Sequence, residues 1–162
     1  MKHARELLSI LALMAVSACT TVHGVTPLSP AVGSPAWPSV VTSLQPTLSW
    51  QPAKEADVAY DLIVYESIRT GDDWNGYKIL PGKEIYYREA LHETSHQIQD
   101  ALKPATQYFW SVRLRRGDDV APWARYDWTM FLVFSYSYAY DQYFSFKTPD
   151  NVVPGKEAAG GS

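Results

Sequence analysis

The sequence predicts an all-β fold, an antiparallel β-sandwich, because short segments alternate apolar and polar residues with a period of two and turn signals separate them. Residues 60–65 and 108–115 show this alternation most clearly. In the second segment the inward positions are Tyr108, Trp110, Val112 and Leu114, and they alternate with Phe109, Ser111, Arg113 and Arg115. Turns are expected at Gly71-Asp72-Asp73, Pro81-Gly82 and Gly117-Asp118-Asp119.

Two shorter segments add a strand near each end of this series. Leu48 and Trp50 flank Ser49 in the first strand, which Pro52 closes. Residues 143–146 form the closing strand. The chain has 6 Trp and 11 Tyr among 162 residues, so a few large rings can fill the core and others can be left for binding.

The N-terminus is typical of a secretion signal. A basic segment over residues 2–5 precedes an apolar segment over residues 7–16, which is too short to span a membrane. It ends in Val16-Ser17-Ala18-Cys19, and Cys19 is the only cysteine of the chain. These residues resemble the lipobox of bacterial lipoproteins, although valine replaces the usual leucine.

The lipobox resemblance implies that residues 1–18 are a cleaved lipoprotein signal peptide. It also implies that Cys19 carries a thioether-linked diacylglycerol and an acylated amino group, with acyl chains such as palmitate. Several such chains hold a protein stably on a membrane. Thr20 stands where an aspartate is the usual inner-membrane retention signal. We therefore expect the cell envelope, and the periplasmic face of the outer membrane in a host that has one.

Composition divides the rest of the chain into three parts. Residues 19–38 are rich in Pro, Ser and Thr and predict a semi-extended tether. Residues 39–150 have the length of one domain. Residues 151–162 offer almost nothing to bury and predict a disordered tail. The net charge of −3 and the lack of a basic stripe argue against a nucleic-acid partner.

The most specific stretch of the domain is Leu102-x-Pro104-x-Thr106-x-Tyr108. It resembles the signature of fibronectin type III domains, which implies an immunoglobulin-like sandwich with a tyrosine corner. In that arrangement Leu102 plugs the end of the sandwich. The hydroxyl of Tyr108 reaches back to upstream backbone while its ring is buried.

Other positions follow the same family order over about residues 40–149. Leu48-x-Trp50 resembles strand B, residues 60–64 strand C, residues 94–98 strand E, and Phe146-x-Thr148 the end of strand G. Trp123 resembles the tryptophan that often precedes strand G. The sequence departs from the family at two places. An extra loop or hairpin is expected within residues 68–94, and an aromatic insertion lies before the last strand.

The segment His92-Glu93-Thr94-Ser95-His96 matches the HExxH motif of zinc hydrolases. On a helix the two histidines would share a zinc ion, with Glu93 as general base. A helical apolar stripe that includes Leu91 and Ile98 leaves that possibility open. The polar neighbours and the lack of an obvious third ligand favour a strand, on which positions i and i+4 lie about 13 Å apart. We therefore expect no metal and no cofactor, and His92 and His96 stay minor metal candidates.

Other arrangements that could carry chemistry are weak. The chain has no Gly-x-Ser-x-Gly elbow and no phosphate-binding loop. Its paired carboxylates are expected to form turns, because Asp bonds its own backbone; they are Asp72, Asp73, Asp118 and Asp119.

The aromatic insertion over residues 125–142 has two interpretations. In the first, the segment folds back as an extra hairpin and buries its rings on the sandwich, since apolar aromatic residues usually belong to the core. Alternatively they form an exposed platform for a glycan or a partner protein. The candidate platform residues are Trp128, Tyr136, Tyr138 and Tyr140, and the three tyrosines would share one strand face.

The sequence thus predicts a lipid-anchored envelope module that binds or scaffolds another envelope protein and has no catalytic activity. A glycan- or peptidoglycan-binding module that uses the aromatic platform is the alternative. A zinc hydrolase at His92, Glu93 and His96 is a minor alternative. Fold class alone does not choose among them.

Overall fold

The structure is a computed structural model that describes residues 17–30, 37–72, 76–131 and 137–150. Every regular element within these ranges is a β-strand, and none of the described residues forms a helix long and apolar enough to cross a membrane. The prediction of an all-β fold is therefore confirmed. The strands are β1 (Ser17–His23), β2 (Pro27–Ser29), β3 (Ser39–Val40), β4 (Thr47–Trp50), β5 (Ala59–Asp72), β6 (Gly76–Leu91), β7 (Ser95–Gln97), β8 (Gln107–Arg116), β9 (Asp119–Val120), β10 (Arg125–Phe131), β11 (Ser137–Gln142) and β12 (Phe144–Lys147).

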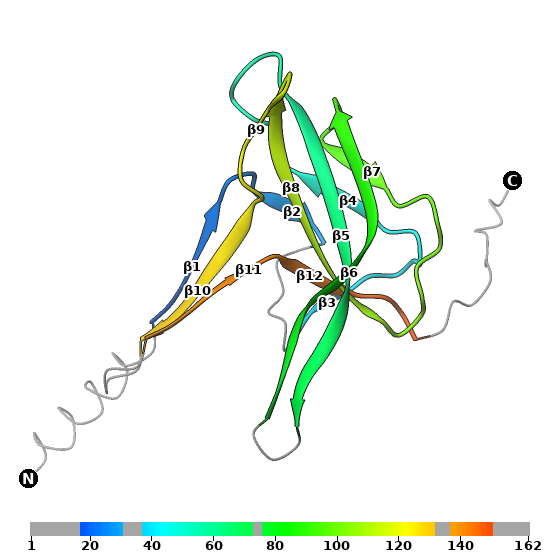
Figure 1. Ribbon diagram of the computed structural model, residues 1–162, viewed down its shortest axis with the longest axis vertical. Helices are drawn as coiled ribbons and strands as arrows, with labels where there is room; N and C mark the ends of the chain where they lie inside the picture. The colour runs from blue at the N-terminus through cyan, green and yellow to red at the C-terminus, as the bar shows by residue number, and fades with distance from the viewer. Residues whose placement is uncertain (1–16, 31–36, 73–75, 132–136, 151–162) are drawn as a thin grey trace, which may run out of the picture.

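The strands form three sheets (Figure 1). The largest has the order β3-β12-β8-β5-β6, and β9 pairs with β8 at its end. β5 runs antiparallel to both β6 and β8 and lies between them, and β8 is the middle strand of this order. A second sheet has the order β2-β4-β7, and a third the order β1-β10-β11.

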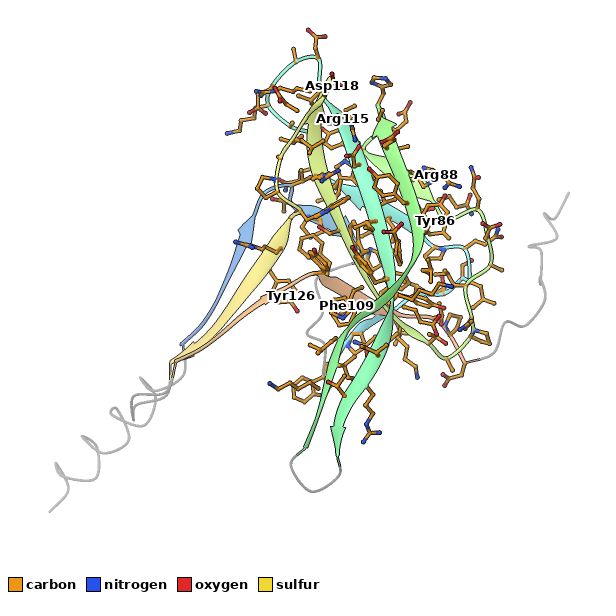
Figure 2. The ribbon with its side chains drawn as sticks, viewed as in Figure 1. Tyr86, Arg88, Phe109, Arg115, Asp118 and Tyr126 are labelled. Carbon is orange, nitrogen blue, oxygen red and sulfur yellow. The ribbon has the colours of Figure 1, made fainter. Side chains whose placement is uncertain are left out.

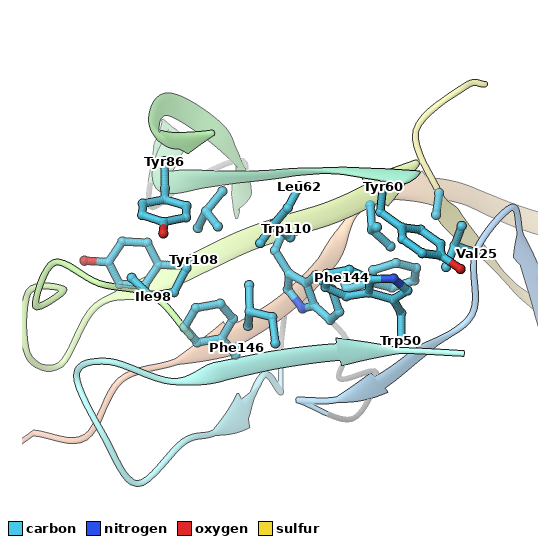
Figure 3. Packing of buried hydrophobic residues seen from close by; sticks show 14 of the residues in the cluster. Val25, Trp50, Tyr60, Leu62, Tyr86, Ile98, Tyr108, Trp110, Phe144 and Phe146 are labelled. Carbon is cyan, nitrogen blue, oxygen red and sulfur yellow. The ribbon is translucent and has the colours of Figure 1, made fainter. Parts of the chain in front are cut away.

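One buried cluster joins the largest sheet to the β2-β4-β7 sheet (Figure 3). The ring of Trp50 on β4 lies 5.5 Å from that of Tyr60 on β5, and Trp110 on β8 lies 5.3 Å from Phe144 on β12. The period-two alternation produces this cluster because successive residues of a strand point to opposite faces. Its fully buried members are Leu48, Trp50, Leu62, Val64, Ile98, Trp110, Val112, Ala124, Phe144 and Phe146.

The turn into β8 has the local geometry that its sequence predicts. Leu102 is buried, and the hydroxyl of the buried Tyr108 accepts a hydrogen bond of 3.0 Å from the backbone N–H of Lys103. Thr148, just after β12, ties the same turn to the end of the domain. Its hydroxyl donates to the Lys103 carbonyl at 2.7 Å and accepts from the Thr106 N–H at 2.9 Å. The bond predicted for the Tyr108 hydroxyl is therefore present.

The extra element expected within residues 68–94 is the outer part of a long hairpin. β5 and β6 stay paired from Tyr60 opposite Leu91 to Asp72 opposite Gly76. The turn predicted at Pro81-Gly82 is wrong, because both residues lie inside β6 next to a register shift. Proline is tolerated there because β6 is an edge strand.

The segment predicted as a tether contributes strands. Most of β1 and all of β2 lie in residues 19–38. Val25, between the two strands, is buried in the core. Residues 20–22 are Thr-Thr-Val, whose branched side chains favour strands, and Pro27 occupies the first position of an edge strand, where it removes no ladder bond. The tail predicted at 151–162 lies outside the described residues.

The β1-β10-β11 sheet, here called the arm, projects from the rest of the molecule (Figure 1). Its three strands contact chiefly one another. The aromatic insertion provides the β10–β11 hairpin of the arm, and β1 adds the third strand. Tyr126 at the base of the hairpin belongs to the core, where its ring stacks on that of Phe144 with the ring centres 6.1 Å apart.

Candidate binding surface

The register of the arm places the three strands in rows of directly opposed residues. One row holds Cys19, Thr129 and Ala139. The next row toward the body holds Thr20, Trp128 and Tyr140, and the one after it holds Thr21, Asp127 and Asp141. On the other side of the cysteine row, toward the end of the hairpin, lie Ala18, Met130 and Tyr138.

Three of the four candidate platform residues meet in this register. Trp128 lies directly opposite Tyr140, and Met130 lies opposite Tyr138. These four positions share one face of the arm, because strand positions two apart lie on the same face. Tyr126 occupies that face at the base of the arm, so the face continues the one that β10 turns to the core. Tyr136 lies outside the described residues.

The residues of the HExxH motif lie in a bend at Glu93 and Thr94 and in the strand β7 that follows it. His92 follows β6 directly and His96 is the middle residue of β7, so the two histidines do not share the face of a helix. The strand predicted at 94–98 is confirmed by the pairing of Leu48 with His96 in the β2-β4-β7 sheet. Within the described ranges, no group of three or more His, Cys, Asp or Glu side chains is placed to hold a metal ion.

His96 has a structural partner instead. One ring nitrogen, Nε2, lies 2.7 Å from the hydroxyl of Tyr86, and the two rings lie 5.7 Å apart. Burial lowers the pKa of His96 below its usual value of 6.5, and the positive charge of Arg88 lowers this pKa further. The guanidinium of Arg88 itself lies 4.2 Å from the centre of the Tyr86 ring. His96 is therefore neutral at pH 7 and bonded within the fold.

A charged cluster on the outer face of the largest sheet was not identified from the sequence. The carboxylate of Asp61 on β5 is fully buried and accepts four hydrogen bonds. Its Oδ1 receives the Ala90 N–H at 3.1 Å and Arg115 Nε at 2.7 Å. Its Oδ2 receives Arg113 Nε and Arg115 Nη2, both at 2.9 Å.

Electrostatics keep this carboxylate ionised. Burial by itself raises the pKa of Asp61, but the hydrogen bonds from Arg115, Ala90 and Arg113 outweigh it and hold the pKa below 3.8. The same contact raises the pKa of Arg115 above its usual value. The cluster is a fixed ion network and leaves no reactive carboxylate.

Aromatic rings extend this cluster toward the loop before β10. The guanidinium of Arg113 lies 4.3 Å from the centre of the Trp123 ring, within the range of a cation–π contact. The ring of Tyr87 on β6 meets Trp123 edge-on at 6.4 Å. Trp123 therefore packs on the outer face of the sheet. Figure 2 shows Arg115 near the β8–β9 end of this face, far from the arm.

One sequence signal pointed to the Asp61 cluster. The outward positions of residues 60–65 include one acid, Asp61, and those of residues 108–115 include two arginines. Opposite charges on directly paired strands attract, and the register places Asp61 opposite Arg113. That register depends on the pairing of two strands far apart in the chain, which the alternation alone does not determine.

The predicted turn aspartates lie where turns or strand ends occur. Gly117 and Asp118 form the turn between β8 and β9, and Gly117 has a φ of +56°. Asp119 begins β9 and Asp72 ends β5. Asp73 lies outside the described residues.

Comparisons with known proteins assign no relative: no protein-family model, no curated protein and no solved structure matches this chain.

Proposed function

We propose that this protein is a lipid-anchored lipoprotein of the cell envelope that acts as a non-catalytic binding module. The observation that carries the proposal is the sequence Val16-Ser17-Ala18-Cys19 directly after a basic and an apolar segment. Signal cleavage before the chain's one cysteine gives a lipidated N-terminus and places the domain at a membrane surface. With Thr20 after the cysteine, the expected location is the periplasmic face of the outer membrane.

Signal cleavage is compatible with the arm. Removing residues 1–18 takes away Ser17 and Ala18, which pair with Phe131 and Met130. The pairs from Cys19 opposite Thr129 to His23 opposite Arg125 remain. Most of β1 therefore persists as the first strand of the mature chain.

The finer fold assignment is an immunoglobulin-like sandwich of the fibronectin type III kind. Two observations support it: side chains of two sheets share one core, and the Tyr108 hydroxyl bonds the Lys103 N–H. A domain of this kind supports many functions, so the site has to carry the functional argument.

The outer part of the β5–β6 hairpin is the surface that best suits a protein partner. β6 is an edge strand, and edge strands accept a further strand from another chain. Ile68 and Leu80 pair directly in this hairpin and are 46% and 39% exposed. An apolar pair beside an open strand edge offers both contact area and backbone hydrogen bonds to an extended segment of an envelope protein.

A glycan is the second candidate ligand, favoured by the position of Trp128 opposite Tyr140 on the arm. Aromatic faces of this kind stack on the apolar faces of sugar rings. Cell-wall fragments should then bind the protein and lose affinity when both residues are replaced by alanine. Unchanged affinity in that double variant would remove the arm as a glycan site.

The lipid anchor is tested in cells. Labelled palmitate should enter the wild-type protein and not the Cys19→Ser variant, and only the wild type should fractionate with membranes. Incorporation of label into the variant would contradict the proposed anchor.

The protein-binding role is tested by crosslinking in intact envelopes. A specific crosslinked partner should be lost in the Ile68→Lys and Leu80→Lys variants. It should be retained in Val120→Lys, a matched control at a residue that is 41% exposed on β9. A partner retained by all three variants would show that the hairpin is not the binding surface.

A further inference from the structure

The arm holds the proposed lipid-attachment residue and the chain's longest aromatic stretch in adjacent rows. Cys19 lies opposite Thr129, and Met130 and Tyr138 are opposed to each other one row further toward the hairpin end. A lipid on Cys19 therefore brings this part of the β10–β11 hairpin to the bilayer surface. The pairing of the strands, and not proximity in sequence, creates this juxtaposition.

We propose that the strand residues of the β10–β11 hairpin at and beyond the cysteine row, residues 129–131 and 137–139, insert into the interfacial region of the bilayer beside the acyl chains, as a second membrane contact of the protein. This inference rests on the proposed lipidation of Cys19. The inserting part comprises the described strand residues at and beyond the cysteine row, with Trp128 and Tyr140 next to them on the side of the body.

Charge distribution sets the boundary of the inserting part. No residue from 128 to 140 carries a charge. Asp127 and Asp141 lie directly opposite each other at the edge of this stretch, two rows from Cys19 on the side of the body. Two carboxylates in one row are costly to desolvate, so this row stays in water. Tryptophan and tyrosine, which prefer the boundary between water and lipid, occupy the row between.

The depth of insertion follows from strand geometry. Phe131, the last residue of β10, lies two residues beyond Thr129, so at about 3.3 Å per residue the described part of β10 reaches roughly 7 Å beyond the cysteine row. Interfacial segments bury their apolar face about 5–10 Å into the headgroup and acyl boundary. Deeper insertion is disfavoured because β1 and β11 are edge strands, whose open backbone groups need water.

The aromatic face is more easily explained by a membrane than by a sugar. The positions of Trp128 and Met130 lie on the face of β10 that also holds Tyr126, and the arm projects beyond the body (Figure 1). An apolar face of this kind needs an apolar neighbour outside the body. The acyl chains on Cys19 would hold a bilayer at that position permanently, whereas a glycan would have to displace it.

Fluorescent labelling at single introduced cysteines tests the proposal on the lipidated full-length mature protein. Lipidation consumes the thiol of Cys19, so a cysteine introduced elsewhere is the only one that reacts. Met130→Cys and Tyr138→Cys place an environment-sensitive dye on the two strands of the hairpin. Asp118→Cys is the control, because Asp118 lies at the end of the molecule away from the arm (Figure 2). Each variant is reconstituted in phosphatidylethanolamine–phosphatidylglycerol vesicles that contain a lipid-borne quencher.

The dye at positions 130 and 138 should shift its emission to the blue on reconstitution and be quenched by the lipid. The dye at position 118 should do neither. Water-like emission without quenching at both arm positions would overturn the inference. A blue shift caused by soluble cell-wall fragments in the absence of vesicles would also overturn it and would favour the glycan role.

The two proposals fail in different ways. If mass spectrometry finds no acyl chain on Cys19, the proposed anchor fails and the inference loses its basis. If Cys19 is acylated and the dyes at 130 and 138 remain in water, the anchor stands and the inserted arm alone is refuted. Unchanged far-UV circular dichroism identifies the labelled variants that keep the fold.

Discussion

Replacing Asp61 by alanine perturbs the most concentrated set of polar contacts in the described structure. The substitution removes the acceptor of four hydrogen bonds, three of them from Arg113 and Arg115. The carboxylate is fully buried, whereas the side chains of both arginines are 19% exposed. The variant therefore leaves two guanidinium groups beside an uncharged position, with only partial access to water.

The expected loss is large relative to the stability of a small domain. Removing one partner of a buried ion pair costs about 3–5 kcal/mol, because the other charge is left uncompensated. The partial exposure of both arginines lets water replace some of the lost bonds, so the lower end, about 3 kcal/mol, is expected for Asp61→Ala. Domains are stable by about 5–15 kcal/mol in total.

Urea unfolding at pH 7 measures this loss. Asp61→Asn, which keeps the volume but not the charge, should also be strongly destabilised. Glu55→Ala is the control, because Glu55 forms an exposed ion pair with Arg116 at 3.4 Å and such pairs contribute little. A loss in Asp61→Ala no larger than that in Glu55→Ala would refute the assignment of a stabilising role to the cluster.

The same residue predicts a pH dependence. Because the pKa of Asp61 is lower in the folded protein than the ordinary value of 3.8, folding favours its ionised form. Its contribution to stability is present in full above the unfolded pKa and is lost as the pH falls through the folded pKa. The wild type should therefore lose stability below about pH 4, and Asp61→Asn should show a shallower acid dependence. Parallel curves for the two proteins would contradict this.

Three further predictions concern single contacts. Tyr108→Phe removes the acceptor of the Lys103 N–H and should lower the free energy of unfolding by about 1–2 kcal/mol, measured by urea titration; no loss would show that water replaces the bond. Gly82→Ala places a Cβ 2.9 Å from the carbonyl oxygen of Glu66, so thermal unfolding should show a destabilisation of about 1–3 kcal/mol. A neutral effect would mean that the hairpin relaxes freely. Because the pKa of His96 is lowered in the folded protein, the unfolded chain binds a proton more readily, and the free energy of unfolding should fall as the pH drops below 6.5. His96→Gln should flatten this part of the stability curve. An unchanged slope in the variant would assign the pH dependence to another group.

Local patterns predicted the parts of the fold that depend on neighbouring residues. The alternation around Trp110 places β8 and its buried face correctly, and the Leu102 to Tyr108 segment predicts the bond between the Tyr108 hydroxyl and upstream backbone. The strand around His96 is also predicted, because the polar neighbours of the HExxH segment suit an exposed strand better than a buried zinc-binding helix. In these cases chemistry within about ten residues decides the structure.

Long-range pairing accounts for what sequence analysis missed. Residues 19–38 have the composition of a tether, but residues 17–23 form the strand β1, which pairs with β10. Pro81 and Gly82 have turn chemistry, but the pairing of β6 with β5 extends through them at a bulge. The Asp61 cluster needs three strands in register. In the candidate surface, only the register could reveal that the position of Trp128 lies opposite that of Tyr140 and that Cys19 lies one row away.

The mass of the N-terminal peptide of the mature protein, isolated from envelopes of the native host, decides whether Cys19 is cleaved and lipidated. If Cys19 is the lipid-attachment residue, this peptide begins at Cys19 and carries a diacylglycerol on sulfur and an acyl chain on the amino group. A chain that retains Ser17 and Ala18, or that begins elsewhere with a free thiol at Cys19, would contradict the proposed anchor and with it the placement of the arm at the bilayer.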